Sequence, residues 1–338
     1  MHLLTSLSSG IVLLLMVKPG ALAYPGPGLV NGDTAVRYRL SFLRSPPTYQ
    51  SPLAQVHDPS IARGADGTYI MAATGNGIPI WTSSDRTTWT LRGSAFPDGA
   101  PKATEAYTKT VDGDLWAPDV TCIDGKFVMY YTASTFGSQE SAIFMAQSPT
   151  GLPGTWLDNG KVLSSKTGDS FNAIDPNLMV TSKGKWYLSF GSFWEGIYLV
   201  QLNSKTGKVS STNGGYTHIA GRNGGAIEAP WIIETNGFYY LFTSWDKCCS
   251  GTASTYNVRV TRSSNGITGP YKDRNGVNAT AGGGTLVLES HDDIVGPGGQ
   301  SLLKDADGVV LVYHYYTSLD SQLGINVLDF SSGWPVVY

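Results

Sequence analysis

Three acidic residues stand next to a proline, or one residue away from it, in a chain of 338 residues: Asp58 in HDPS, Asp175 in IDPN and Glu228 in IEAP. Their neighbours are small or apolar, a setting in which a carboxylate is costly unless it is paired or used. Carboxyl groups that converge push their pKa values apart, so that one keeps its proton while another is ionised. Glycoside hydrolysis requires this arrangement, because a carboxylic acid protonates the leaving oxygen while a carboxylate activates water or attacks the carbon. The three residues are therefore candidates for acid and base catalysis of glycosidic bond cleavage.

The alternative for Asp58 or Asp175 alone is an Asx turn before proline, which needs no catalytic role. Only 14% of the residues are charged, against about 25% in an average soluble domain. Three acids at matched positions in so sparsely charged a chain favour a shared function. Asp119 in WAPD follows its proline instead, so we expect it to point elsewhere and to support the structure.

One sequence pattern recurs five times and would bring these acids together. A polar-to-proline turn is followed, after a short gap, by a glycine, an aromatic-rich strand and a third, alternating strand. The glycines are Gly67, Gly125, Gly184, Gly237 and Gly308. A repeat of roughly 50 to 70 residues with several short strands is typical of antiparallel sheets arranged radially. We predict an all-β fold, a five-bladed β-propeller with about four antiparallel strands per blade.

The third strands of the repeats are expected at residues 78–83, 142–148, 197–202, 257–262 and 325–330. A pair of β-sandwiches would also show alternating strands, but it gives no reason for one type of turn to recur before every second strand. In a propeller the first strand of each blade lies closest to the axis, so the three acids would converge in a catalytic funnel there.

The N-terminal residues predict secretion. An apolar run at residues 11–17, followed by Ala21-Leu22-Ala23, is typical of a signal peptide covering residues 1–23, and it is too short to span a bilayer. The remaining residues 24–338 would form a single propeller domain. Asn278 opens the glycosylation sequence Asn-Ala-Thr in a glycine-rich stretch, which is a second indication of a secreted protein.

Charge and cysteine content narrow the choice of partners. A net charge of −3 offers no broad positive field for phosphates, so a neutral polysaccharide fits better than nucleic acid. We expect a monomer with no membrane partner and no organic cofactor. Three cysteines are too few for a disulfide scaffold and lack the spacing of a zinc site. Cys122 is expected to be a buried thiol, whereas the adjacent Cys248 and Cys249 either form a disulfide between neighbours or remain two thiols.

Eight segments together resemble glycoside hydrolase family 43, in its arabinanase branch: VHDPS, LWAPDV, AIDPNL, SFGSFW, GAIEAP, CCSGTASTYNVRV, VYHYY and LDFSSGWPVV. The resemblance extends from about Tyr24 to Tyr338 and is strongest to secreted fungal members. It implies a five-bladed propeller that cleaves α-1,5-L-arabinofuranosidic linkages inside linear arabinan of plant pectin, with inversion. Asp58 would be the general base, Glu228 the general acid, and Asp175 the residue that orients Glu228 and tunes its pKa.

Aromatic and polar side chains near these turns are candidates for sugar binding. Aromatic rings offer large rigid surfaces to sugars, although many of them must simply belong to the core. The aromatic candidates are Trp116, Phe136, Phe193 and Trp194. Asn177 and Ser192 resemble sugar-binding positions of the family, and both could instead be turn residues.

His314 in VYHYY lies among apolar residues on the aromatic strand of the fifth repeat. It is either a core histidine with satisfied hydrogen bonds or, as the resemblance suggests, a residue that faces the axis and binds a calcium ion or its water shell. His57, next to Asp58, is expected to pack or to orient rather than to catalyse.

Two segments depart from the family pattern. Related arabinanases often read HGPGH where this chain has Val295 and Gly299 around GPG, and CCRG where it has Ser250 in place of the arginine. These changes keep the three acids but leave open subsite affinity, metal coordination and substrate preference.

Three alternative functions remain open at this point. An exo-acting α-L-arabinofuranosidase or β-xylosidase of the same family would release single sugars, and a non-catalytic sugar-binding propeller would use the acids to hold hydroxyl groups. A retaining fructan hydrolase is disfavoured, because its family begins with an NDPNG-like motif and this chain has HDPS at residues 57–60. Loops between the blades decide whether the funnel is an open cleft or a closed pocket, and with it the choice between internal and terminal cleavage.

Overall fold

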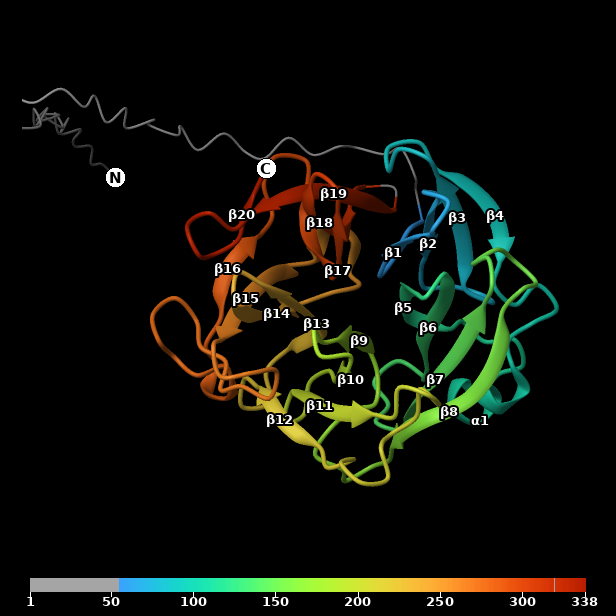
Figure 1. Cartoon of the computed structure of the whole chain (residues 1–338), viewed down its shortest axis with the longest axis horizontal. Coiled ribbons are helices and arrows are strands. Elements are labelled where there is room, and N and C mark those ends of the chain that lie inside the picture. The colour runs from blue at the N-terminus through green and yellow to red at the C-terminus, as the bar shows by residue number, and fades with distance from the viewer. Residues whose placement is uncertain (1–54, 319) are drawn as a thin grey trace, which may run out of the picture. The chain divides into compact units, whose positions relative to one another are not determined.

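The computed structural model describes residues 55–318 and 320–338, and the predicted signal peptide at residues 1–23 lies outside them. The described residues form five four-stranded antiparallel sheets, each built from strands that are consecutive in the chain. Figure 1 shows these sheets in chain order around a central axis. The predicted five-bladed β-propeller with four strands per blade is thus confirmed.

Each blade is a meander of four strands. Blade 1 contains β1 (Ser60–Arg63), β2 (Tyr69–Ala72), β3 (Pro79–Ser83) and β4 (Thr90–Ser94). Blade 2 contains β5 (Trp116–Ile123), β6 (Lys126–Ala133), β7 (Ser141–Ser148) and β8 (Leu157–Ser165). Blade 3 contains β9 (Asn177–Val180), β10 (Trp186–Phe190), β11 (Ile197–Leu202) and β12 (Thr217–Ala220).

The last two blades follow the same order. Blade 4 contains β13 (Ile227–Thr235), β14 (Phe238–Trp245), β15 (Asn257–Ser263) and β16 (Thr285–Leu288). Blade 5 contains β17 (Val295–Asp305), β18 (Gly308–Tyr316), β19 (Ser321–Asp329) and β20 (Val336–Val337). The helical segments are short and lie in loops: η1 (Lys102–Thr104), α1 (Glu105–Thr108), η2 (Gly251–Ala253) and η3 (Ala279–Ala281). Among the described residues, no helix combines the length and apolar character needed to cross a bilayer.

The repeated glycines sit in the turns between the first and second strands. All five have a positive φ, from +71° at Gly184 to +137° at Gly308, a region of backbone conformation that glycine enters without a steric penalty. The second strands therefore begin within two residues of the positions expected from the sequence. The expected third strand of blade 5 was wrong at its start, because its pairing with β18 continues to Ser321 opposite Tyr316.

The hydrophobic core is divided into five clusters, and each cluster joins two neighbouring blades. Ile70 of blade 1 packs in one cluster with Phe127 of blade 2, and Met71 of blade 1 packs in another with Val312 of blade 5. The ring is therefore closed by packing between β1 and the last blade as well as along the chain. Hydrogen bonds reinforce this closure, because the Ser301 hydroxyl donates to the carbonyl oxygen of Pro59 at 2.7 Å.

Polar side chains on the first strands also tie each blade to the next around the axis. Three of them accept a backbone N–H from the following blade: Ser60 from Val120 (3.0 Å), Asp119 from Leu178, and Asn177 from Ile232 (2.9 Å). This ring of hydrogen bonds holds the ends of the first strands in fixed positions, and these ends carry the candidate catalytic acids.

Candidate active site

The same backbone bend precedes the inner proline in every blade. The residue before this proline has a φ between +41° and +57° in all five repeats: Asp58, Ala117, Asp175, Ala229 and Gly296. A left-handed backbone is costly for residues other than glycine and is often found at functional sites. In blades 1 and 3 an acid occupies this bend, whereas in blade 4 the acid is Glu228, one residue earlier. The predicted matching of the three acids is thus close but not strict.

The bends place the acids at one end of the propeller axis. Asp58 and Asp175 line one axial pocket together with the prolines that follow them. Glu228 is joined to this group, because the backbone N–H of its neighbour Ala229 donates to Oδ2 of Asp175 at 3.0 Å. The electrostatic influence of Asp58 reaches both other acids. The predicted convergence of the three acids therefore matches the structure.

Asp58 lies in surroundings that favour its ionised form. Its Oδ2 atom contacts Nδ1 of His57 at 2.8 Å and accepts the Thr74 hydroxyl at 2.7 Å. Burial alone would raise the pKa of Asp58. Charge and hydrogen bonding from His57, with smaller contributions from His314 and Thr74, outweigh burial and hold this pKa well below its usual range.

Glu228 has the opposite tendency. Its carboxyl group accepts hydrogen bonds from the Ser192 hydroxyl at 2.7 Å and from the Tyr256 hydroxyl at 2.8 Å. Burial raises the pKa of Glu228, and these hydrogen bonds only partly offset the effect. Burial also raises the pKa of Asp175 well above its usual range, and the negative charges of Glu228 and Asp58 raise it further. An ionised Asp58 thus stands beside two carboxyl groups that favour the protonated form.

This arrangement can carry out acid and base chemistry at one place. Asp58 can accept a proton from water, while Glu228 can donate a proton to a leaving oxygen. The coupling between Glu228 and Asp175 is mutual, so a negative charge on one favours a proton on the other. The sequence suggested that acid and base catalysis would need acids whose pKa values are driven apart. The geometry of the site meets this requirement.

The predicted sugar-binding role of Asn177 is corrected by the structure. Its side chain is 1% exposed, and its amide oxygen accepts both the Ile232 N–H at 2.9 Å and the Ser189 hydroxyl at 3.3 Å. Asn177 therefore links blades 3 and 4 instead of facing a ligand. Asp119 is equally buried and bonds to Leu178, in keeping with the structural role expected for it.

The polar and aromatic candidates near Glu228 fall into two groups. Ser192 is buried and its hydroxyl is engaged by Glu228, so its direct partner is the acid. The next two residues, Phe193 and Trp194, are 43% and 36% exposed and both have a positive φ. Phe193 is anchored by its N–H to the carbonyl oxygen of Ile227 at 3.0 Å, so the exposed pair is fixed beside the strand of Glu228.

The other two aromatic candidates lie in blade 2. Phe136 is 88% exposed in the loop after β6, and Trp116 is half-buried at the start of β5. Trp116 precedes Ala117, whose N–H donates to the Thr74 hydroxyl that also bonds to Asp58. The position of Trp116 next to this hydrogen-bond chain keeps it a candidate for sugar contact.

Two direct partners of the acids, Thr74 and Tyr256, were missed by the sequence analysis. Tyr256 lies within the segment CCSGTASTYNVRV, but nothing in a single sequence shows that its hydroxyl reaches Glu228. Thr74 follows the aromatic-rich strand of blade 1 and carries no motif of its own. Both reach an acid only through the assembled ring of blades.

The calcium site that the resemblance suggests at His314 stays a prediction, and the structure shows which protein groups contact this ring. Its ring is fully buried and stacks on His57 with centroids 3.7 Å apart. Nδ1 accepts the Asp58 N–H at 3.1 Å, and Nε2 lies 3.0 Å from the Tyr316 hydroxyl. Both ring nitrogens are therefore engaged by protein groups. Through its contact with the backbone, His314 supports Asp58.

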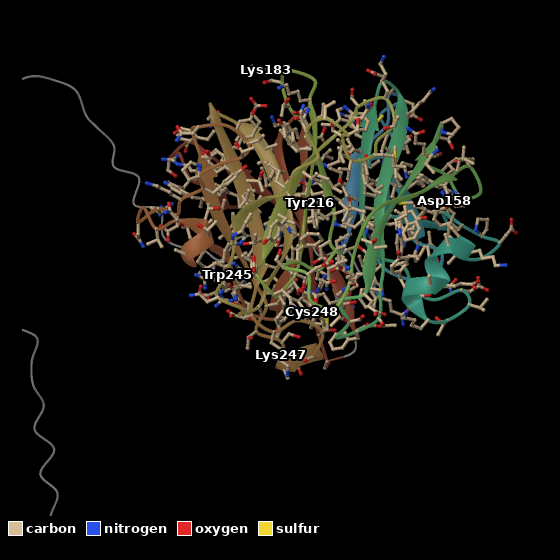
Figure 2. The ribbon with its side chains drawn as sticks, turned by 90° about the horizontal axis from the view of Figure 1, so that it is seen from below. Asp158, Lys183, Tyr216, Trp245, Lys247 and Cys248 are labelled. Atoms are coloured by element: carbon tan, nitrogen blue, oxygen red, sulfur yellow. A yellow bond between two sulfur atoms is a disulfide. The ribbon has the colours of Figure 1, made fainter. Side chains whose placement is uncertain are left out.

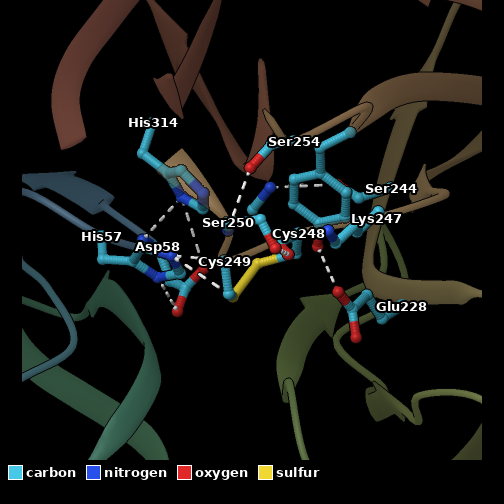
Figure 3. Close-up of a disulfide and its surroundings, with 12 residues drawn as sticks. His57, Asp58, Glu228, Ser244, Lys247, Cys248, Cys249, Ser250, Ser254 and His314 are labelled. Atoms are coloured by element: carbon cyan, nitrogen blue, oxygen red, sulfur yellow. Dashed lines mark hydrogen bonds and ion pairs between the residues drawn. A yellow bond between two sulfur atoms is a disulfide. The ribbon is translucent and has the colours of Figure 1, made fainter. Parts of the chain in front are cut away.

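The three cysteines also take definite places. Cys248 and Cys249 form a disulfide with an Sγ–Sγ distance of 2.06 Å, and both sulfur atoms lie within 3.9 Å of Nε2 of His57 (Figure 3). Figure 2 shows Cys248 at the end of the blades opposite Lys183, a residue of the turn between β9 and β10. Cys122 is a free thiol. It is half-buried rather than buried as expected, and it lies near the C-terminal end of β5.

Gly299 explains one departure from the family pattern. Its φ is +56°, and a Cβ atom added there would lie 2.7 Å from two ring atoms of His314 and closer still to Oδ1 of Asp58. The space that a histidine side chain would need at this position is filled by Asp58 and His314. Ser250, at the other departure, donates its hydroxyl to the carbonyl oxygen of Cys248 at 3.3 Å and so stays within its own loop.

Comparison with known proteins adds independent information. Residues 49–335 match Glycosyl hydrolases family 43. The chain is 42% identical to the probable arabinan endo-1,5-α-L-arabinosidase A of Emericella nidulans, covering 86% of this chain and 94% of that protein. It is 40% identical to the extracellular endo-α-(1→5)-L-arabinanase 1 of Bacillus subtilis, with coverage of 83% and 87%.

Solved structures agree with this relationship. The α-L-arabinanase of Cellvibrio cellulosa complexed with arabinohexaose superposes with a TM-score of 0.79 at 35% identity, covering 85% of this chain and 96% of that one. An exo-1,5-α-L-arabinanase from a bovine ruminal metagenomic library has a TM-score of 0.78 at 39% identity, with coverage of 84% and 96%. The similar proteins thus include some named for internal cleavage and one named for terminal cleavage.

Proposed function

Because the chain belongs to glycosyl hydrolase family 43, we propose that it cleaves α-1,5-L-arabinofuranosidic linkages inside linear arabinan, with inversion at the anomeric carbon. The observation that carries the proposal is the pair of opposed tendencies at the axis, a lowered pKa at Asp58 and a raised pKa at Glu228. The names of the curated fungal and bacterial relatives support arabinan as the substrate. The solved structure containing arabinohexaose supports a site that accepts several sugar units in a row.

The reaction assigns one proton movement to each of two residues. Glu228 donates its proton to the glycosidic oxygen as the bond between this oxygen and the anomeric carbon breaks. Asp58 accepts a proton from the water molecule whose oxygen forms the new bond to that carbon. Exchange with solvent then returns a proton to Glu228 and removes one from Asp58. Protons and charge balance over the cycle.

Asp175 acts through Glu228 in this proposal. Its Oδ2 atom holds the backbone directly after Glu228, and the two carboxyl groups titrate as a coupled pair, so ionisation of one disfavours ionisation of the other. The same contact fixes the side of the funnel from which the proton is delivered. The exposed rings of Phe136, Phe193 and Trp194, with the half-buried ring of Trp116, would carry the flanking sugar units.

The early products of hydrolysis test the proposal. Linear 1,5-arabinan, xylan and arabinoxylan are incubated with the enzyme and with a Glu228→Gln variant, and the first products are sized by chromatography. We expect mixed arabino-oligosaccharides from linear arabinan with the unaltered enzyme alone. Release of only single arabinose units would replace internal cleavage by the exo mode of the ruminal relative. Binding of arabinan without any product would replace hydrolysis by a sugar-binding function.

The compartment proposed for this enzyme is extracellular. The Bacillus subtilis relative is described as extracellular, and a disulfide between Cys248 and Cys249 persists in an oxidising environment. Asn278 is exposed, as a glycosylation site must be. Expression in a fungal host, with the mass of the secreted protein measured before and after deglycosylation, tests secretion, the predicted cleavage after residue 23 and the use of Asn278. Size-exclusion chromatography of the same sample tests the expected monomer.

A further inference from the structure

The Tyr316 hydroxyl is the meeting point of three nitrogen atoms from different parts of the chain. It lies 2.9 Å from Nε2 of His57, 3.0 Å from Nε2 of His314 and 3.0 Å from the backbone nitrogen of Cys249. It also lies 3.4 Å from Sγ of Cys248. One phenol oxygen therefore connects the disulfide to both histidines that contact Asp58.

The direction of each hydrogen bond follows from counting protons. A phenol oxygen donates one hydrogen bond and accepts two. The Cys249 N–H supplies one of the accepted bonds. Nδ1 of His314 accepts the Asp58 N–H and is therefore unprotonated, so the ring proton of neutral His314 is on Nε2 and supplies the second.

With both acceptor positions filled, the hydroxyl of Tyr316 has its own proton left for Nε2 of His57. Neutral His57 must then carry its ring proton on Nδ1, and that proton goes to Oδ2 of Asp58 at 2.8 Å. Thr74 donates to the same oxygen. Oδ1 of Asp58 is left as the oxygen that can take a proton from water.

We propose that Tyr316 is a positioning residue for the carboxylate of Asp58, and that the disulfide between Cys248 and Cys249 is the platform that holds Tyr316 in place. This proposal rests on the proposed role of Asp58 as general base. Tyr316 reaches Asp58 through His57 and through His314, so it fixes both the tautomer of one ring and the place of the other.

The disulfide acts locally in this arrangement. A bond between adjacent cysteines closes almost no loop in the unfolded chain, so it contributes little through chain entropy. It restrains instead the peptide between the two residues, where Cys249 has a φ of +61° and directs its N–H at the Tyr316 oxygen. Figure 3 shows the disulfide between His57 and Asp58 on one side and Glu228 on the other.

Loss of the Tyr316 hydroxyl would change the charge next to Asp58. Burial lowers the pKa of His57, but the charges of Asp58, Glu228 and Asp320 outweigh burial and raise it. While Tyr316 donates to Nε2, a second proton on His57 has no acceptor there. Without the hydroxyl this obstacle is gone, so the imidazolium that lowers the pKa of Asp58 should persist to higher pH and weaken the carboxylate as a base there.

The test compares Tyr316→Phe with Tyr315→Phe in the full-length enzyme acting on linear arabinan. Tyr315 is a buried neighbour that packs in the core cluster between blades 4 and 5, so it controls for loss of a buried phenol. We expect Tyr316→Phe to lower kcat roughly tenfold to a hundredfold with little change in KM. The acidic limb of its pH profile should move to higher pH, and the Tyr315→Phe profile should stay in place.

The disulfide is tested separately. Cys248→Ser/Cys249→Ser should lower kcat in the same direction by a smaller factor, and a reductant should do the same to the unaltered enzyme in a way that reoxidation reverses. The double variant should not respond to reductant. A Cys122→Ser variant should respond to reductant and recover on reoxidation like the unaltered enzyme, because Cys122 is not part of the disulfide. If Tyr316→Phe fails to fold, this disulfide experiment still tests the positioning role of Tyr316.

Titration of the His57 ring by NMR separates this proposal from the proposed function. Tyr316→Phe should raise the pKa of His57 whether or not the protein turns over arabinan. A folded Tyr316→Phe variant with unchanged kcat, unchanged pH profile and unchanged His57 titration overturns the positioning role. An inactive but folded unaltered enzyme, in which the variant still shifts His57, overturns the proposed function alone.

Discussion

Ala229 donates its backbone N–H to Oδ2 of Asp175 at 3.0 Å, which ties the second carboxyl group to the residue directly after Glu228. Any movement of Asp175 is thereby transmitted to the strand that carries the proposed acid. The two carboxyl groups are also coupled by charge, since Glu228 raises the pKa of Asp175 and the effect is mutual. Position and protonation of Glu228 therefore depend on the same neighbour.

Replacing Asp175 by Asn should shift the pH dependence of the enzyme as well as its rate. Where Asp175 ionises, its charge favours a proton on Glu228, and an asparagine cannot have this effect, so the descending limb of the kcat profile should move to more acidic pH. We expect kcat to fall by about a hundredfold, since the contact with Ala229 is also altered. A pH series of kcat measures both effects, with the exposed Asp98→Asn as control. An unmoved descending limb would contradict the coupling.

Glu228→Gln and Asp58→Asn should respond differently to the leaving group. The glutamine cannot protonate the departing oxygen, so hydrolysis of linear arabinan should be lost, whereas an arabino-oligosaccharide with a nitrophenyl leaving group needs little protonation and should still be cleaved. Asp58→Asn removes activation of water, so cleavage of both substrates should fall by a factor of about 100 or more. Equal losses on both substrates in the Glu228 variant would remove this residue as the acid.

The fold was predictable because its signals are local. Each blade repeats a proline after a strained bend and a glycine with positive φ at the next turn, and both features are visible in any single repeat. The placing of Asp58, Asp175 and Glu228 near one axis followed from this repetition. Asn177 stands within the same pattern, yet its side chain accepts a hydrogen bond from Ile232 in the next blade. This contact could not be predicted from the repeat, because Ile232 is 55 residues away in the sequence.

The partners of the acids were not predictable, because they are far from the acids in the sequence. Tyr316 is 259 residues from His57 in the sequence, and the two meet only where the last blade closes against the first. The function of His314 depends on which atoms its two nitrogens contact, and Asp58 and Tyr316 take both. The family resemblance suggested a ligand for a metal ion, and the surrounding hydrogen bonds show a support for the proposed base.

Gly299→Ala should impair catalysis more than backbone strain alone can explain. The new methyl group would press on Oδ1 of Asp58 and on the His314 ring, so we expect kcat to fall by about a hundredfold. Gly237→Ala is the matched control, because Gly237 has a φ of +78° and nothing within 4 Å of an added Cβ atom. Both variants should lose thermal stability through the positive φ, and Gly299→Ala should lose more because its methyl group overlaps Asp58 and His314. Equal activity of the two variants would show that Asp58 has room to move.

Asp119→Asn should change how stability depends on pH. Burial raises the pKa of Asp119 to about 7, against only partial compensation by its hydrogen bonds, and one of its carboxyl oxygens has no hydrogen-bond partner. A raised pKa in the folded state stabilises the protein below the ordinary pKa of aspartate, and this contribution is lost as the pH rises through 7. The loss is at most about 1.4 kcal/mol per pH unit.

An asparagine at this position keeps an acceptor for the Leu178 N–H and does not ionise. The melting temperature of Asp119→Asn relative to the unaltered enzyme should therefore increase from pH 4 to pH 8, while activity on arabinan at pH 5 stays within about twofold because Asp119 contacts none of the three acids. Differential scanning calorimetry at several pH values measures the difference. A constant difference across this range would mean that Asp119 is ionised throughout, and the ring of hydrogen bonds around the axis would then hold a buried charge.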